Sequence, residues 1–65
     1  MDYAMVAGMS IEQIINALRE DGFEHIATRS KARDIREAAK SGSLLWTESR
    51  LIMTDESRID ARPNA

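Results

Sequence analysis

The sequence predicts a small α+β domain in which two helices pack on one face of a C-terminal antiparallel β-hairpin. Residues 10–21 and 30–40 each show the apolar spacing of a helix with one buried face, and residues 43–54 hold two apolar runs around a polar tetrapeptide. Each helical stretch ends at a glycine, Gly22 or Gly42, the residue that most readily takes the left-handed conformation after a helix. Helices followed by a hairpin predict the α+β class.

The length of 65 residues leaves room for one domain. We expect a single compact domain at residues 10–60, preceded by an N-terminal arm at 1–9 and followed by a frayed tail at 61–65. In the arm, three side chains would either cap the core or form an edge strand: Tyr3, Met5 and Val6.

The first helix has signals for both of its ends. Ser10 and Gln13 have the spacing of a capping box, in which each side chain accepts a hydrogen bond from the other residue's backbone N–H. At the other end, Gly22 and Phe23 fit the C′ and C″ positions of a Schellman ending. Its buried face is formed by Ile11, Ile14, Ile15 and Leu18.

The second helix carries much of the positive charge. Residues 23–28 lead into it and are consistent with either a short extra strand or an extended connector, and Thr28 or Ser30 would be its N-cap. At about 100° per residue, its apolar stripe comprises Ala32, Ile35, Ala38 and Ala39. Beside this stripe lies a row of cations, the basic ridge, formed by Arg29, Arg33, Arg36 and Lys40.

The hairpin is predicted with a four-residue loop, Thr47–Arg50, because Glu-Ser is not a favoured pair for a two-residue turn. This loop places Trp46 opposite Leu51, and it also pairs Leu45 with Ile52 and Leu44 with Met53. One face is then wholly apolar and should close the core, with Leu44, Trp46, Leu51 and Met53. The other face is mixed, with Leu45, Thr47, Arg50 and Ile52. After the hairpin, Thr54 or Ser57 would cap one helical turn containing Ile59.

The composition argues against an enzyme or a cofactor-binding protein. The chain has no cysteine and one histidine, His25, so a metal site would need scattered carboxylates. Its three glycines are isolated and form no phosphate-binding loop. No apolar run approaches the roughly 18 residues that would suggest a membrane span. We therefore expect a cytoplasmic protein without catalytic residues, metal or cofactor.

The segment from residue 30 to residue 54 resembles the recognition helix and wing of excisionase-type winged-helix proteins. It is a basic helix ending in K-S-G, followed by the hairpin L-L-W-T-E-S-R-L-I-M. The resemblance implies a DNA-binding regulator whose helix enters the major groove and whose wing contacts the backbone or the minor groove. The residues that would face DNA are Arg29, Arg33, Arg36 and Lys40 on the helix and Arg50 on the wing.

The charge balance favours a protein partner. The net charge is −2, and outside residues 29–40 the chain holds nine anions against four cations. In size and charge it is similar to small phage-encoded inhibitors such as anti-CRISPR proteins, which implies a non-enzymatic regulator that blocks a nucleic-acid-binding complex. We expect an acidic surface to meet that partner, formed by Glu20, Asp21, Glu24, Asp55 and Glu56.

Leu45 and Ile52 form a second candidate interface on the outer hairpin face. Through this face, or through edge pairing of the hairpin, the protein would form a homodimer. The sequence leaves protein and DNA partners open.

Overall fold

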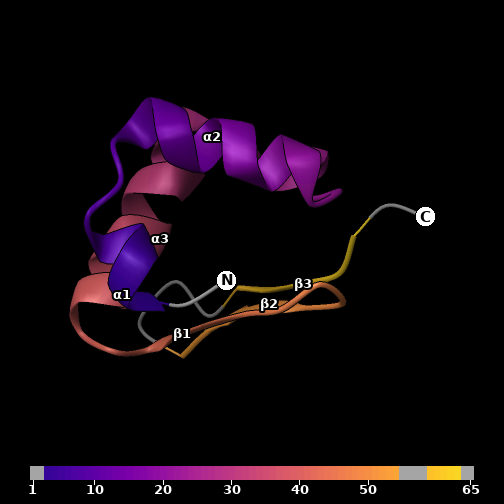
Figure 1. The fold of residues 1–65 in the computed structure, drawn as a ribbon. Coiled ribbons are helices and arrows are strands. Elements are labelled where there is room, and N and C mark those ends of the chain that lie inside the picture. Colours follow the sequence, from indigo (N-terminus) through magenta and orange to yellow (C-terminus); the bar gives the residue numbers. More distant parts are fainter. Residues whose placement is uncertain (1–2, 55–58, 64–65) are drawn as a thin grey trace.

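The computed structural model describes residues 3–54 and 59–63, and in these ranges the fold is α+β. The helical part comprises α1 (Tyr3–Ala7), α2 (Ile11–Glu20), the short 3₁₀ helix η1 (Glu24–Ile26) and α3 (Arg29–Lys40). The sheet comprises β1 (Leu44–Trp46), β2 (Leu51–Met53) and β3 (Asp60–Ala61), in the order β1-β2-β3 with antiparallel pairing throughout. Figure 1 shows the helices as one layer above the sheet, with α2 farthest from the strands.

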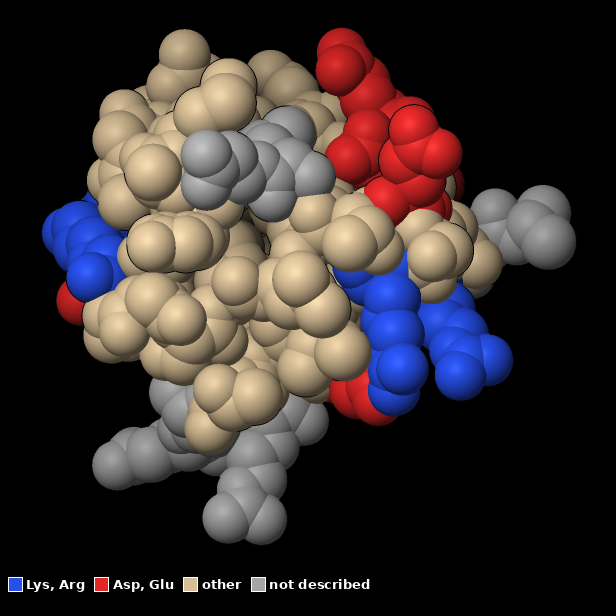
Figure 2. Space-filling model, turned by 60° about the horizontal axis from the view of Figure 1, so that its bottom comes forward, with Lys and Arg blue, Asp and Glu red and all other residues tan. Residues whose placement is uncertain are grey.

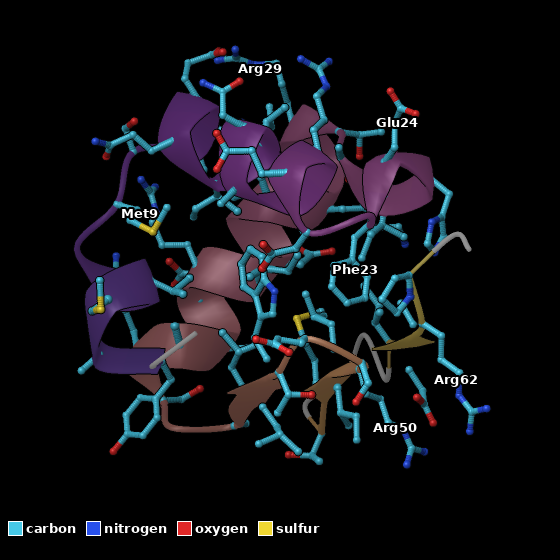
Figure 3. All side chains as sticks on the ribbon, turned by 45° about the vertical axis from the view of Figure 1, so that its right-hand side comes forward. Met9, Phe23, Glu24, Arg29, Arg50 and Arg62 are labelled. Atoms are coloured by element: carbon cyan, nitrogen blue, oxygen red, sulfur yellow. The ribbon has the colours of Figure 1, made fainter. Side chains whose placement is uncertain are left out.

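The ends of α2 confirm both sequence signals. The Ser10 hydroxyl accepts from the Gln13 N–H at 3.2 Å, and the Gln13 side chain accepts from the Ser10 N–H at 2.8 Å. At the C-terminal end Gly22 has φ 88°, and the N–H of Phe23 donates to the Leu18 carbonyl at 2.7 Å, which completes the Schellman ending. This turn directs the Phe23 side chain into the core between helices and sheet (Figure 3).

The helix α3 begins and ends in the same manner. Thr28 is its N-cap and accepts from the Lys31 N–H at 3.2 Å. At the other end Gly42 has φ 73°, and the Ser43 N–H donates to the Ala38 carbonyl at 2.8 Å. The helix packs against both α1 and α2 and also contacts β1. Its predicted apolar stripe is buried, namely Ala32, Ile35, Ala38 and Ala39.

The hairpin has the predicted register, with Leu44 opposite Met53, Leu45 opposite Ile52 and Trp46 opposite Leu51. Thr47 and Arg50 close the four-residue loop, because the Thr47 N–H donates to the Arg50 carbonyl at 2.8 Å. The predicted inner face is buried as expected, and it consists of Leu44, Trp46, Leu51 and Met53.

The N-terminal arm and the segment at residues 23–28 differ from what the sequence predicts. Residues 3–7 form α1 rather than an edge strand, and the fully buried Val6 caps the core, which was the other expected alternative. Residues 24–26 form η1 rather than a strand, because the Ala27 N–H bonds locally to the Glu24 carbonyl at 3.1 Å.

The tail differs as well, since Ala61 is buried in β3 opposite Leu51 instead of frayed. Ile59 precedes this strand, and its carbonyl accepts from the Met53 N–H at 2.8 Å, so it does not lie in a helical turn. Ser57, the alternative cap of that turn, lies outside the described residues.

Candidate functional site

The outer face of the hairpin exposes apolar surface. Because side chains alternate along a strand, Leu45 points away from the core with 53% of its surface exposed, and Ile52 beside it is half-buried. These two side chains border an open hollow of about 260 Å³ next to the turn between α3 and β1. The hollow is lined by Gly42, Ser43, Leu44, Leu45, Ile52 and Thr54. The predicted pair of interface residues is therefore adjacent and accessible, and the hollow is a feature that the sequence did not predict.

An ion pair borders this face on the β3 side. The Arg50 guanidinium donates from Nε to Oδ1 of Asp60 at 3.0 Å and from Nη2 to Oδ2 at 2.7 Å. The hydrogen bonds from Arg50 hold the pKa of the Asp60 carboxyl below its usual value, and the same contact raises the pKa of Arg50. Arg50, the expected wing contact to DNA, is thus bound to a carboxylate of this chain.

The acidic cluster at the C-terminal end of α2 is exposed. Glu20, Asp21 and Glu24 all lie on the surface, and Figure 2 shows acidic side chains gathered at one margin of the molecule. Asp21 also has a structural contact, because its Oδ2 accepts from Nε1 of the buried Trp46 at 3.0 Å. Within residues 3–54 and 59–63, none of the three forms an ion pair with a lysine or arginine. Asp55 and Glu56, the remaining members of the expected surface, lie outside the described residues.

The basic ridge of α3 is partly neutralised by neighbouring acids. Arg29 forms an ion pair with Glu12 of α2, and Lys40 pairs with Glu37 at 3.3 Å. Arg36 is half-buried, and its buried Nε has no hydrogen-bond partner within the described part of the chain. Arg33 is exposed.

Arg29, at the start of the ridge, and the hairpin arginine Arg50 lie on opposite sides of the molecule. Figure 3 shows Arg29 on the helical side of the molecule and Arg50 on the sheet side, pointing in different directions. The structure therefore does not bring the five cations of the winged-helix interpretation together on one surface.

Sequence reasoning missed two side-chain contacts, Trp46 with Asp21 and Arg50 with Asp60. Both join residues whose proximity depends on tertiary structure: Asp21 is the C-cap of α2, and Asp60 belongs to a two-residue strand. Capping patterns and strand alternation describe each segment separately, so they contain no signal for such pairs.

Within the described residues, no cluster of three or more His, Cys, Asp or Glu side chains is arranged to hold a metal ion. No helix in this part of the chain has the length and apolar character needed to cross a bilayer. Comparisons with protein-family models, curated proteins and solved structures find no match.

Proposed function

We propose that this protein is a non-enzymatic regulator that binds a basic surface of another protein through the acidic end of α2. The observation that carries the proposal is that Glu20, Asp21 and Glu24, exposed at the end of α2 and the start of η1, form no ion pair with a described lysine or arginine. In contrast, Arg29, Lys40 and Arg50 each pair with an acid of this chain. These acids are thus among the surface charges that are available to a partner.

The position of these acids strengthens the argument. Carboxylates at a helix C-terminus oppose the helix dipole, at a cost of about 0.3–1 kcal/mol each in exposed positions. Asp21 offsets this cost by accepting the Trp46 hydrogen bond, whereas no side-chain hydrogen bond or ion pair of Glu20 to a described residue does so. A partner rich in lysine and arginine would neutralise both glutamates, and complementary charge would also speed the encounter.

The partner class that we infer is a nucleic-acid-binding protein, since its binding surface must be basic. This is the mode of action expected of a phage-encoded inhibitor of the anti-CRISPR kind, which would occupy that surface in the cytoplasm. A DNA-binding role for α3 has weaker support, because three of its five expected DNA contacts are already paired with carboxylates. Exposed pairs of this type contribute only about 0–1 kcal/mol and can open, so DNA remains the alternative to test.

The first test compares two isosteric double variants with the same change in net charge. Glu20→Gln with Glu24→Gln removes two unpaired acids, whereas the control, Glu12→Gln with Glu37→Gln, removes the acids that pair with Arg29 and Lys40. Each protein is immobilised and incubated with a nuclease-treated cell lysate, and captured proteins are identified by mass spectrometry. We expect nucleic-acid-binding proteins to be lost with the first variant and retained with the control. If both variants captured the same proteins, the proposal would be wrong.

The second test is a titration of labelled duplex DNA with protein at low salt. We expect no binding at micromolar protein. Binding that falls steeply with salt, and that is lost in the double variant Arg33→Glu and Arg36→Glu, would decide for the DNA-binding alternative.

A further inference from the structure

We propose that Met5 is a site of reversible oxidation to methionine sulfoxide in the folded protein, and that hydrogen peroxide modifies it without disturbing the core. In this reaction a bond forms between the Met5 sulfur and one peroxide oxygen as the O–O bond breaks. The proton of the transferred oxygen passes to the departing hydroxide, and water leaves, so that the sulfur is oxidised by two electrons and the peroxide is reduced. The inference concerns α1, which the proposed function does not use.

The exposure of Met5 is the first argument. The residue is 64% exposed, the largest exposed fraction of any large hydrophobic residue in the described part of the chain. The next residue, Val6, is fully buried. Successive residues of a helix point about 100° apart, so the packing of Val6 turns Met5 away from the core. An oxidant in solution can therefore reach the Met5 side chain without any opening of the fold.

The backbone around Met5 is the second argument. The Met5 carbonyl accepts a hydrogen bond from the Gly8 N–H at 3.1 Å, and the Val6 carbonyl accepts one from the Met9 N–H, also at 3.1 Å. The helix α1 packs against α3 and contacts β1. The exposure of Met5 is therefore a property of the folded chain, because the backbone that carries this side chain is held by hydrogen bonds and by tertiary contacts.

The contrast with the other described methionines is the third argument. Met53 lies on the inner face of the hairpin and is 1% exposed. Met9 is half-buried and packs against the core, and Figure 3 shows it between α1 and α2. A buried methionine reacts only when the fold opens around it, and core segments open least often. We therefore expect the rate of oxidation to fall from Met5 to Met9 to Met53.

The consequence of oxidation also depends on burial. A sulfoxide is polar, so at Met53 it would place an unsatisfied acceptor in the core, which destabilises the folded state. At Met5 the new oxygen can accept hydrogen bonds from water, because the side chain is already exposed. Oxidation of Met5 therefore changes the chemistry of the α1 surface and leaves the packing intact. Methionine sulfoxide reductases can reverse it.

The test is a time course of the full chain in hydrogen peroxide, with tryptic digestion and tandem mass spectrometry to locate each added oxygen. The same course in concentrated urea gives the rate of each methionine in the unfolded chain. Relative to these reference rates, we expect Met5 of the folded protein to react at least about tenfold faster than Met53. A smaller ratio would overturn the proposal. Methionine sulfoxide reductases of both stereospecificities, supplied with a thiol reductant, should then remove the oxygen from Met5.

The control variant is Met5→Leu, which removes the sulfur but keeps an apolar side chain of similar size. We expect Met53 to be oxidised at the same slow rate in this variant as in the original protein, because the sulfoxide at Met5 does not open the core. Slower oxidation of Met53 in the variant would show that modification of Met5 loosens the fold, and it would overturn the proposal. Loss of the circular dichroism spectrum after oxidation of Met5 alone would overturn it equally.

Discussion

Neighbouring residues of the hairpin have different roles, because they lie on its inner or its outer face. On the inner face Leu44, Trp46, Leu51 and Met53 are 0–6% exposed, whereas Leu45, between two of them in the chain, is 53% exposed. Trp46 meets Phe23 edge to face, with ring centroids 6.2 Å apart, and donates its indole hydrogen bond to Asp21. The outer face has an open hollow and a surface ion pair instead. Strand alternation alone thus separates the residues that stabilise the fold from those available for contact with another molecule.

The largest expected difference between the faces comes from the same substitution at two leucines. Leu51→Ala removes a fully buried side chain and should lower the free energy of unfolding by about 2–5 kcal/mol. Leu45→Ala removes a side chain that is already half in water and should cost less than about 1 kcal/mol. Urea unfolding measures both. Equal losses for the two variants would contradict the division of the hairpin into two functional faces.

Substitution of Asp21 should have an effect of intermediate size on stability, because this residue joins the acidic cluster to the inner face. Asp21→Ala removes the acceptor for the Trp46 indole and should cost about 1–3 kcal/mol. Asp21→Asn keeps an acceptor oxygen at the same place, so it should retain most of the stability while removing the charge. Thermal unfolding of both variants distinguishes the two roles. Equal destabilisation by alanine and asparagine would mean that the charge, rather than the acceptor, stabilises the fold.

The smallest effect is expected at the ion pair of the outer face. The folded-state pKa of Asp60 lies below its usual value of 3.8 because Arg50 donates two hydrogen bonds to the carboxylate. The stabilisation of the fold by this ion pair is therefore complete above the usual pKa of an Asp carboxyl. It is lost as the pH falls through the lower pKa that Asp60 has in the folded state. Asp60→Asn should reduce the loss in free energy of unfolding that the original protein shows on acidification. Urea unfolding between about pH 2 and 6, the range in which Asp carboxyls titrate, measures this loss.

High salt provides the check on this prediction. Because the pair is solvent-exposed, about 1 M salt should reduce the difference between Asp60→Asn and the original protein. A difference that is independent of salt and pH would show that Asp60 acts by pairing in β3 rather than through its charge.

Local signals predicted a large part of the fold. The Ser10–Gln13 capping box, the two glycine endings and the hairpin register depend on residues close in the sequence, and all three are confirmed. The helix α1 was not predicted, because Y-A-M-V-A has neither an acidic first turn nor a basic last turn, and its buried residue is Val6. Such a short helix gains its stability mainly from tertiary packing.

The third strand was missed for a similar reason. Asp60 and Ala61 have low strand propensity, and they pair with β2 through contacts that appear only in the folded chain. The pair Leu45 and Ile52 was predicted as an adjacent exposed surface, since alternation and register determine which side chains share a face. The hollow beside them depends on how the α3–β1 turn lies against the sheet, which no periodicity encodes.

The most direct test of the two-face account is the urea midpoint of Leu45→Lys, measured beside those of the original protein and of Leu51→Ala. Because the Leu45 side chain is 53% exposed, a lysine can extend into water at this position, and the midpoint should stay close to that of the original protein. Leu51→Ala should have a clearly lower midpoint, because Leu51 is fully buried. A midpoint for Leu45→Lys that is lowered as much as that of Leu51→Ala would contradict the account.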